Sequence, residues 1–311
     1  MNSATIDIIV HGSIVQDFVS YTEEFPRLGE TVRGTFSDAP GGKGANQAAQ
    51  AALLGANVCM IGMVGNDVFG SSNINNLKEF GVNTEYIRVS ERNKTGCATI
   101  IVTKDGQNSI IIAPGANLET PPNQIDELEE TIASTKMVLC QNETAHDSIK
   151  RIFELAKKYN VRTFFNYAPI DKKFDKNILK LTDILCVNEI EGEHLSGQQV
   201  RTIKDALKIT KILFDFGPSI VIMTLGSQGV VYNFEDIESG HIVVPSVKVV
   251  DTTGAGDSFC GALAYFLVKR PELELKEQIR RAAHISAYSV QRVGTRDSYL
   301  RRSEVPDDLL K

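Results

Sequence analysis

The chain has 311 residues, of which 42% are hydrophobic and 23% are charged. A chain of this length buries about three quarters of its unfolded surface and needs no disulfide or metal to fold, and its ordinary composition excludes a disordered, collagen-like or coiled-coil protein. Its 33 basic and 39 acidic residues give a net charge of −6. This charge disfavours a nucleic acid or an anionic membrane surface as a partner, because both select basic proteins.

The sequence also lacks the segments that are typical of secreted and membrane proteins. No apolar run approaches the roughly 20 residues that span a bilayer. Residues 1–14 lack the basic and apolar segments of a signal peptide. The five cysteines form no CxxC pair, and four of them lie in apolar segments, where thiols are usually small buried hydrophobic groups. We therefore expect a soluble protein of the reducing cytoplasm, with the nucleus as a second compartment.

Six short apolar runs predict the strands of the fold. Each is four to seven residues long and lacks the polar alternation of a strand with one solvated face. Such runs are typical of strands buried on both faces, as in a parallel sheet covered by helices. In chain order they are residues 6–10, 58–64, 137–140, 161–165, 184–187 and 220–225.

Helical patterns separate most of these runs. Apolar residues at i, i+3 and i+4 spacing predict a helix over 149–159, with Asn160 at its C-terminal end, and a second helical face ends at Gly81. Alternating strands and helices with right-handed crossovers form a doubly wound sheet. We therefore predict an α/β fold with a doubly wound, mostly parallel sheet flanked by helices.

Two segments depart from this alternation. Residues 95–113 contain two strand-like runs around Asp105-Gly106, and Asp-Gly between such runs indicates a hairpin. Residues 14–36 show little helical pattern. A small antiparallel sheet that protrudes from the body would explain both observations. We predict a single domain over residues 1–311, with a lid formed by about 14–36 and 95–113.

A glycine-rich segment precedes the first predicted helix. Residues 41–47 read Gly-Gly-Lys-Gly-Ala-Asn-Gln and continue into an alanine-rich helix that ends near Gly55. Glycines let backbone amides approach a ligand, and a helix start directs its N–H groups outward. Lys43 and Asn46 could also donate hydrogen bonds to a hydroxylated or anionic ligand. The alternative is a glycine-rich turn that only permits close packing of the helix.

Polar residues follow two of the predicted strands at their carboxyl ends, where open α/β sheets bind ligands. Asn188 and Glu191 lie three residues apart at a helix start and could hold a hydrated Mg²⁺, which usually takes one or two protein oxygens. A capping interaction at the helix N-terminus explains this pair almost equally well. Residues 224–229, Thr-Leu-Gly-Ser-Gln-Gly, suit a nucleotide-binding loop.

A second glycine motif lies between two aspartates. Residues 251–257 read Asp-Thr-Thr-Gly-Ala-Gly-Asp and precede a helix with an apolar face. Helix capping would explain Asp257 alone. The small residues before it leave consecutive amides bare, an arrangement that stabilises developing negative charge. Asp257 could accept a proton from an attacking hydroxyl group, and Asp251 could face a cation.

Together these motifs resemble those of the ribokinase branch of the PfkB family of carbohydrate kinases. The resemblance extends nearly end to end, from Gly12 to Ser298. The motif at 251–257 marks the whole family, whereas the motif at 41–48 is more particular to the ribokinase branch. The resemblance implies the ribokinase-like fold and ATP-dependent phosphorylation of D-ribose at the 5-hydroxyl group. It also implies a homodimer formed through the lids.

The same resemblance implies a role for each motif. Asp257 is the expected general base, and the amides of Gly254, Ala255 and Gly256 form an anion hole. The expected sugar-binding residues are Asp17, Gly42, Lys43, Gly44, Ala45, Asn46, Glu143 and Asp257. ATP with Mg²⁺ is expected to bind Asn188, Glu191, Thr224, Leu225, Gly226, Ser227, Gln228, Gly229, Gly256 and Asp257. A K⁺ ion is expected, mostly on backbone carbonyl oxygens, at Asp251, Thr253, Ser289, Arg292, Gly294 and Ser298.

Three positions depart from the family pattern. Val15 stands where bacterial ribokinases carry a sugar-contacting Asn, so weaker discrimination against 2-deoxyribose is expected. Ala283 replaces a His or Asn near the adenine, and Tyr167 interrupts an Asn-Pro-Ala-Pro sequence. None of these changes removes a catalytic group. Two alternatives remain open: a kinase for deoxyribose, another sugar or a nucleoside, and a non-catalytic protein that binds sugar or nucleotide.

Overall fold

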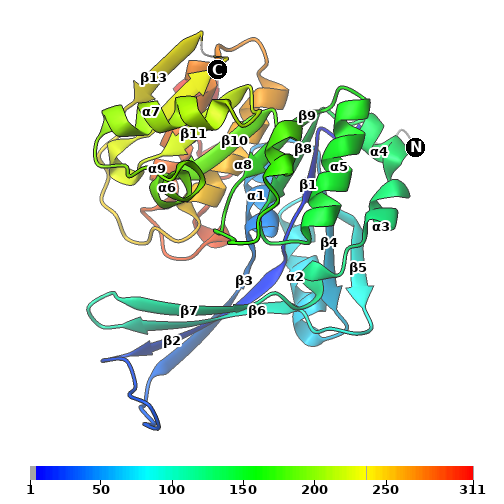
Figure 1. The fold of residues 1–311 in the computed structure, drawn as a ribbon. Coiled ribbons are helices and arrows are strands. Elements are labelled where there is room, and N and C mark those ends of the chain that lie inside the picture. The colour runs from blue at the N-terminus through cyan, green and yellow to red at the C-terminus, as the bar shows by residue number, and fades with distance from the viewer. Residues whose placement is uncertain (1–4, 236, 311) are drawn as a thin grey trace.

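The computed structural model describes residues 5–235 and 237–310. These residues contain a nine-stranded sheet with the strand order β13-β12-β11-β10-β9-β8-β1-β4-β5 (Figure 1). In this spatial order, each strand from β11 through β5 is parallel to its neighbour. Strands β12 and β13 add an antiparallel edge. The predicted mostly parallel sheet is therefore confirmed. Its strands are β1 (Ile8–His11), β4 (Val58–Gly65), β5 (Asn83–Ser90), β8 (Met137–Gln141), β9 (Arg162–Asn166), β10 (Ile184–Asn188), β11 (Ile220–Thr224), β12 (Val230–Phe234) and β13 (Glu238–Ile242).

The inner strands are buried on both faces, as their continuous apolar sequences predict. In β1, Ile8 and Val10 belong to the hydrophobic core on one side of the sheet, and Ile9 belongs to the core on the other. All six predicted strands agree with the observed bounds to within two residues. The edge strands β5 and β13 were not predicted because they are partly exposed, and β12 was missed because its apolar run is short.

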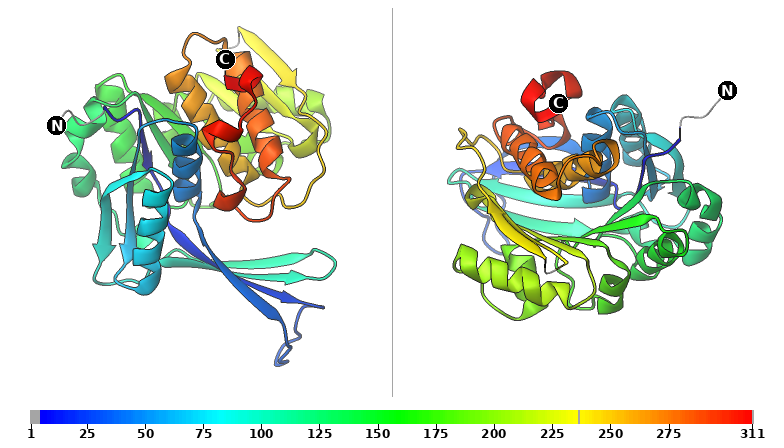
Figure 2. Two further views of the ribbon diagram at one scale, coloured as in Figure 1. Left: turned by 180° about the vertical axis from the view of Figure 1, so that it is seen from behind. Right: turned by 90° about the horizontal axis from the view of Figure 1, so that it is seen from above.

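Helices cover both faces of the sheet (Figure 2). One face packs against α1 (Lys43–Leu53), α2 (Val68–Glu79), α8 (Ala255–Lys269) and α9 (Leu275–Ser289). The other packs against α3 (Pro122–Asp126), α4 (Glu129–Ala133), α5 (His146–Lys158), α6 (Glu189–Ser196) and α7 (Ile203–Phe214). The remaining helices are α10 (Asp307–Leu310) and the 3-10 helices η1 (Gly115–Leu118), η2 (Lys176–Leu181), η3 (Gly226–Gln228), η4 (Arg296–Ser298) and η5 (Arg302–Glu304). Among the described residues, no helix is both long and apolar enough to cross a lipid bilayer.

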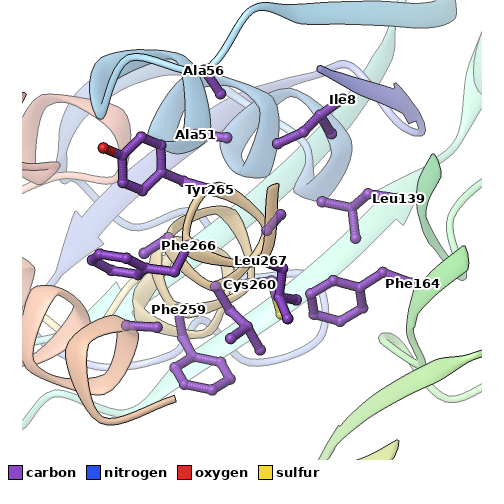
Figure 3. Packing of buried hydrophobic residues seen from close by; sticks show 14 of the residues in the cluster. Ile8, Ala51, Ala56, Leu139, Phe164, Phe259, Cys260, Tyr265, Phe266 and Leu267 are labelled. Atoms are coloured by element: carbon purple, nitrogen blue, oxygen red, sulfur yellow. The ribbon is translucent and has the colours of Figure 1, made fainter. Parts of the chain in front are cut away.

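Helix α8 is buried along nearly its whole length, from Asp257 to Val268. Its Phe259 and Leu267 lie in the same core as Ala51 of α1 and Leu139 of β8 (Figure 3). Protein interiors are packed as densely as organic crystals, so a helix held on all sides cannot shift easily. The packing therefore fixes the N-terminus of α8 relative to α1 and the sheet.

A second sheet of four strands, the lid, protrudes from the body (Figure 1). Its strands, in spatial order, are β3 (Thr35–Gly41), β2 (Val15–Thr22), β6 (Gly96–Thr103) and β7 (Asn108–Ala113). The predicted hairpin is confirmed, because β6 and β7 are antiparallel and Gly106 between them has a φ of 84°. The prediction of a purely antiparallel sheet is wrong, because β2 pairs in parallel with β6. Strand β3 continues to Gly41, beyond the predicted segment 14–36, and so leads directly into α1.

Candidate active site

The predicted motifs meet at one cavity beyond the carboxyl ends of β9, β10 and β11. The cavity has a volume of about 140 Å³ and is lined by Lys43, Asn188, Glu191 and residues 254–257. Its walls come from the starts of α1, α6 and α8. An ammonium group, two carboxylates and a helix N-terminus therefore share one small polar space, although they are far apart in the sequence.

Asp257 projects from the first turn of α8 towards α1. It is 6% exposed and accepts hydrogen bonds from Asn46 Nδ2 (3.0 Å) and from Gln47 Nε2 (2.9 Å), one on each carboxylate oxygen. It does not cap its own helix, because the N-cap of α8 is Gly254 and no side chain caps this helix. The capping interpretation of Asp257 is therefore wrong: the carboxylate is oriented by two amide groups of α1.

Two backbone amides in the first turn of α8, those of Gly256 and Asp257, are open to a ligand, whereas Ala255 N–H donates to the Thr252 carbonyl (3.2 Å). Gly254 has a φ of 74°, which favours glycine, and turns the chain into the helix. Among the hydrogen bonds of the described residues, none has the N–H of Gly256 or of Asp257 as its donor to a protein acceptor. A Cβ at Gly256 would meet no atom within 4 Å. Free first-turn N–H groups beside open space are the usual form of an anion site.

The start of α1 differs, because its amides are used within the protein. Lys43 N–H donates to Glu143 Oε2 (3.1 Å), and Ala45 N–H donates to the Ser13 carbonyl (3.0 Å). Gly44 packs so closely that a Cβ there would lie 2.6 Å from Gly12 Cα. The prediction that these amides approach a ligand is therefore wrong for Lys43 and Ala45, and close packing explains Gly44. What α1 directs to the site is the side chains of Lys43 and Asn46.

Charged side chains gather around this helix start. Burial raises the pKa of Asp17 to about 6 and also raises the pKa of Glu143. The nearby Asp257 carboxylate raises the pKa of Lys43 to about 12. Asp17 lies against Gly41, where a Cβ would be 2.3 Å from Oδ2, and Glu143 also accepts a hydrogen bond from Ser13 Oγ. Hydroxyl donors of a bound ligand would stabilise these partly buried carboxylates in their ionised form.

Asn188 and Glu191 form the capping box that the sequence offered as an alternative. Asn188 Oδ1 accepts from Glu191 N–H (2.9 Å), and Glu191 Oε2 accepts from Asn188 N–H (2.8 Å). Both residues still line the cavity, and burial raises the pKa of Glu191 to about 7. The described residues contain no cluster of three or more His, Cys, Asp or Glu suited to a metal. The carboxylate and amide oxygens fit Mg²⁺, provided that water and phosphate complete its shell.

A larger cavity of about 540 Å³ adjoins the first and shares Thr224, Thr252, Ala255 and Gly256 with it. Of the predicted nucleotide loop, Thr224, Gly226, Ser227 and Gly229 line this cavity, whereas Leu225 and Gln228 do not. Leu225 is buried and Gln228 is exposed. Much of the remaining wall is apolar and includes Val244, Val247, Val249, Phe259, Ala283, Ala287 and Val290. The space suits a flat heteroaromatic group beside the open amides of α8.

The predicted K⁺ ligands lie in two segments that contact each other: the loop before α8, and the chain from the end of α9 to η4. Asp251 accepts from Thr253 N–H (2.9 Å) and from Gly294 N–H (3.0 Å), which joins the loop before α8 to the loop after α9. Asp251 N–H donates to the Val290 carbonyl (3.1 Å), next to Ser289. Arg292 pairs with Glu304 (3.0 Å), so its guanidinium is engaged elsewhere. Ser298 Oγ donates to the Thr295 carbonyl (2.7 Å). The Asp251 carboxylate and the carbonyl oxygens of Ser289 and Val290 thus lie at this junction, and oxygen is the donor that a hard cation takes.

Two side chains that bond to residues of the site were not predicted from the sequence. Gln47 donates to Asp257 and to Asn166 Oδ1 (2.9 Å), and accepts from Gln141 Nε2 (2.8 Å). Arg296 donates from Nε to Asn46 Oδ1 (2.9 Å). Gln47 lies inside the glycine-rich motif at residues 41–47, so its position in the sequence could have indicated a role at the site. Arg296 had no comparable signal, because its partner is 250 residues away in sequence.

A family model described as pfkB family carbohydrate kinase matches residues 5–302. The chain belongs to this family of carbohydrate kinases. Among its relatives, the ribokinase of Mus musculus is 40% identical over 96% of this chain and 93% of its own length. The deoxyribokinase of Salmonella typhi is 34% identical over 94% of this chain and 95% of its own length. A solved structure of Arabidopsis thaliana ribokinase complexed with ribose and ATP has a TM-score of 0.92 and 31% identity, and covers 99% of both chains.

Proposed function

We propose that the protein catalyses the ATP-dependent phosphorylation of D-ribose at the 5-hydroxyl group. The observation that carries this proposal is the Asp257 carboxylate, which is oriented by Asn46 and Gln47 and shares a cavity with Lys43 and the open amides of α8. The similarity to ribokinases over nearly the whole chain supports ribose as the acceptor. A protein that only binds sugar would not need an oriented proton acceptor beside an anion site.

In this mechanism Asp257 accepts the proton of the 5-hydroxyl group as that oxygen attacks the γ-phosphorus of ATP. The bond between this phosphorus and the β–γ bridging oxygen breaks, and ADP leaves with the bridging oxygen. General-base catalysis of this kind contributes about a hundredfold to ten-thousandfold in rate. The open amides of Gly256 and Asp257 stabilise the negative charge of the transferred group, and phosphoryl transfer depends mostly on such positioning and electrostatics. The Lys43 ammonium supplies a fixed positive charge in the same cavity.

The proposed sugar site lies on the lid side of Asp257. Asp17 and Glu143 would accept hydrogen bonds from sugar hydroxyl groups, and Lys43 and Asn46 would donate them. Gly42, Gly44 and Ala45 give the backbone the shape that brings these groups together, since Gly42 has a φ of 94° and Gly44 allows close packing on Gly12. The root of the lid, at Gly41, borders this site and would help to exclude water.

The proposed ATP site is the larger cavity, with the base between the apolar wall and the loop at residues 224–229. Gly256 and Asp257 would face the γ-phosphate. Asn188 and Glu191 would hold Mg²⁺, which supplies charge neutralisation on the phosphate oxygens when it is bound. A K⁺ ion at Asp251, Thr253, Ser289, Arg292, Gly294 and Ser298 would fix the loop that leads into α8.

We also propose a homodimer formed through the lids, in the cytoplasm. All six residues of the edge strand β7 are exposed, among them Ile110, Ile111 and Ile112. An exposed apolar edge strand is a ready template for pairing with a second chain. Analytical ultracentrifugation tests the dimer, and Ile111→Lys should weaken it. The five free cysteines, four of them buried, are consistent with a reducing compartment.

Phosphorylation of 2-deoxyribose is a second candidate activity. It is favoured by Val15, whose apolar side chain offers no hydrogen bond to a sugar hydroxyl group, and by the similarity to a deoxyribokinase. A site without a partner for one hydroxyl group discriminates weakly against the sugar that lacks it.

A coupled assay of ADP release tests both activities across ribose, 2-deoxyribose and a set of nucleosides. We expect ribose to be among the best substrates by kcat/KM, with 2-deoxyribose following. If ribose ranks far below another acceptor, the ribose assignment is lost. If calorimetry detects sugar and ATP binding without turnover of any acceptor, the protein is a non-catalytic binder.

A further inference from the structure

Arg296 is a buried arginine that none of the proposed roles includes. It lies in η4 and is 3% exposed. Within the described part of the chain its guanidinium forms no ion pair but donates to three neutral oxygens. They are Asn46 Oδ1 (2.9 Å from Nε), Asn76 Oδ1 (2.7 Å from Nη1) and the Gly41 carbonyl. Asp17 and Asp257 attract this charge without contacting it. Because a buried charge without a contacting carboxylate is costly, its presence here points to a role in positioning rather than in net stability.

The three acceptors come from three parts of the site. Gly41 ends the lid strand β3, Asn46 lies in the first turn of α1, and Asn76 lies in α2. A guanidinium is planar and presents its donors in a fixed fork. Arg296 can therefore bond all three oxygens only while the lid root, the first turn of α1 and α2 keep this arrangement.

The contact with Asn46 also sets the direction of that side chain. A carboxamide has an acceptor end and a donor end, whereas a guanidinium can only donate. Arg296 therefore selects the carbonyl end of Asn46, which leaves Nδ2 to donate to Asp257 Oδ2 (3.0 Å). If the amide were reversed, Nδ2 would face the donor of Arg296, and Oδ1 would face the acceptor of Asp257. A single side chain thus joins Arg296 to the carboxylate of Asp257.

We propose that Arg296 is a positioning residue that holds Asn46 and the root of the lid so that the Asp257 carboxylate keeps its productive orientation. The inference rests on the proposed role of Asp257 as general base. All three guanidinium nitrogens of Arg296 donate to protein oxygens, so it acts through Asn46 and the root of the lid and not on the substrates.

Arg296→Met removes the donors and keeps the length of the side chain. We expect kcat to fall about tenfold to a hundredfold, because a misplacement near 1 Å costs about this much. Ribose affinity, measured by calorimetry, should change less than kcat. Arg296→Lys keeps a charge without the fork and should lose nearly as much. A wild-type kcat in either variant would overturn the proposal.

The matched control is Arg281→Met. Arg281 of α9 is 7% exposed and donates to Glu277 Oε1 (2.7 Å) and to the Leu309 carbonyl (3.1 Å), and it lines neither cavity. This variant should lower the free energy of unfolding but leave kcat within about twofold of the wild type. An equal loss of kcat in both variants would show that burial of an arginine, and not its contact with Asn46, is what matters, and would overturn the proposal.

A double-mutant cycle with Asn46→Ala tests whether Arg296 acts through Asn46. Contacting residues are non-additive, whereas independent residues add. We expect Arg296→Met to reduce kcat little further once Asn46 is alanine; fully additive losses would overturn the proposal. The free energies of unfolding of the same variants, measured without substrate, should also be non-additive. Additive free energies of unfolding would equally overturn the proposal. If the wild-type protein phosphorylates no sugar, the proposed function fails, while the unfolding cycle still decides the coupling.

Discussion

The starts of α1 and α8 carry the same glycine signature but serve the site differently. Both begin at a glycine with positive φ and without a side-chain cap, at Gly42 (94°) and Gly254 (74°). At α1, Glu143 and Ser13 accept the first amides, and the helix contributes side chains. At α8, the amides of Gly256 and Asp257 have no acceptor in the described protein, and the helix contributes its backbone. A glycine-rich helix start therefore indicates an anion site only where no neighbouring acceptor reaches it.

The largest expected effect lies at α8. Asp257→Asn keeps the shape of the side chain but removes the proton acceptor, so phosphorylation should fall by about two to four orders of magnitude. Stopped assays with ribose and ATP measure the rate, and calorimetry should show that both ligands still bind. Near-normal turnover would contradict the assignment of Asp257 as general base.

A pair of alanine substitutions separates the two helix starts directly. At Gly256 a Cβ meets no protein atom and would occupy the space beside the open amides, so Gly256→Ala should fold normally. We expect it to lower kcat/KM for ATP about tenfold to a hundredfold, because the donors and the phosphate can no longer approach closely.

Gly44→Ala should show the opposite pattern. Its Cβ would lie 2.6 Å from Gly12 backbone atoms, so the free energy of unfolding should fall by about 1–3 kcal/mol or more. Denaturant unfolding of both variants measures the contrast. If Gly44→Ala is as stable as the wild type, or Gly256→Ala is the less stable of the two, the distinction between a packed start and an open start is wrong.

The loop before α8 offers a smaller effect. If K⁺ bound near Asp251 fixes this loop, exchange of K⁺ for Na⁺ should lower kcat several-fold, because a smaller ion fits the same carbonyl oxygens poorly. Initial rates at constant ionic strength measure the change, with choline as the inert control. Equal rates in all three salts would argue against a cation at Asp251.

The smallest expected effect is on the free energy of unfolding, and it comes from the charges around α1. Burial raises the pKa of Asp17 from 3.8 to about 6, so its ionisation opposes folding as pH rises through that range. Asp17→Asn should therefore be more stable than the wild type by about 1–3 kcal/mol at pH 8, and the difference should vanish below about pH 4. Urea unfolding across this range measures it.

Asp7 is the matched control with the opposite sign. Burial acts to raise its pKa, but hydrogen bonds from Lys136, the Asn57 N–H and Lys269 outweigh burial and lower it. Its ionised form therefore adds stability above its ordinary pKa, and that stability is lost as pH falls. Asp7→Asn should be less stable than the wild type at pH 8 and should approach it in acid. If Asp17→Asn is less stable than the wild type at pH 8, as Asp7→Asn is expected to be, then ionised Asp17 does not oppose folding.

The positions of the buried strands followed from the sequence because each is a continuous apolar run with one local explanation. Edge strands such as β5 and β13 have partly exposed sequences, and no local pattern separates them from loops. The glycine-lysine and Asp257 motifs were also visible in the sequence. The sequence did not show whether Asn188 and Glu191 form a capping box, because their spacing is the same in a capping box and in a metal site.

The sequence alone therefore determined the α/β fold, the family and the residue types available for chemistry. Only the tertiary structure decided which groups meet: Asn46 lies 211 residues from Asp257 and 250 residues from Arg296. It also decided that the amides of Lys43 and Ala45 in α1 are occupied while those of Gly256 and Asp257 in α8 are open. The physical reason is that apolar periodicity is a property of one segment, whereas a hydrogen-bond partner depends on how distant segments pack.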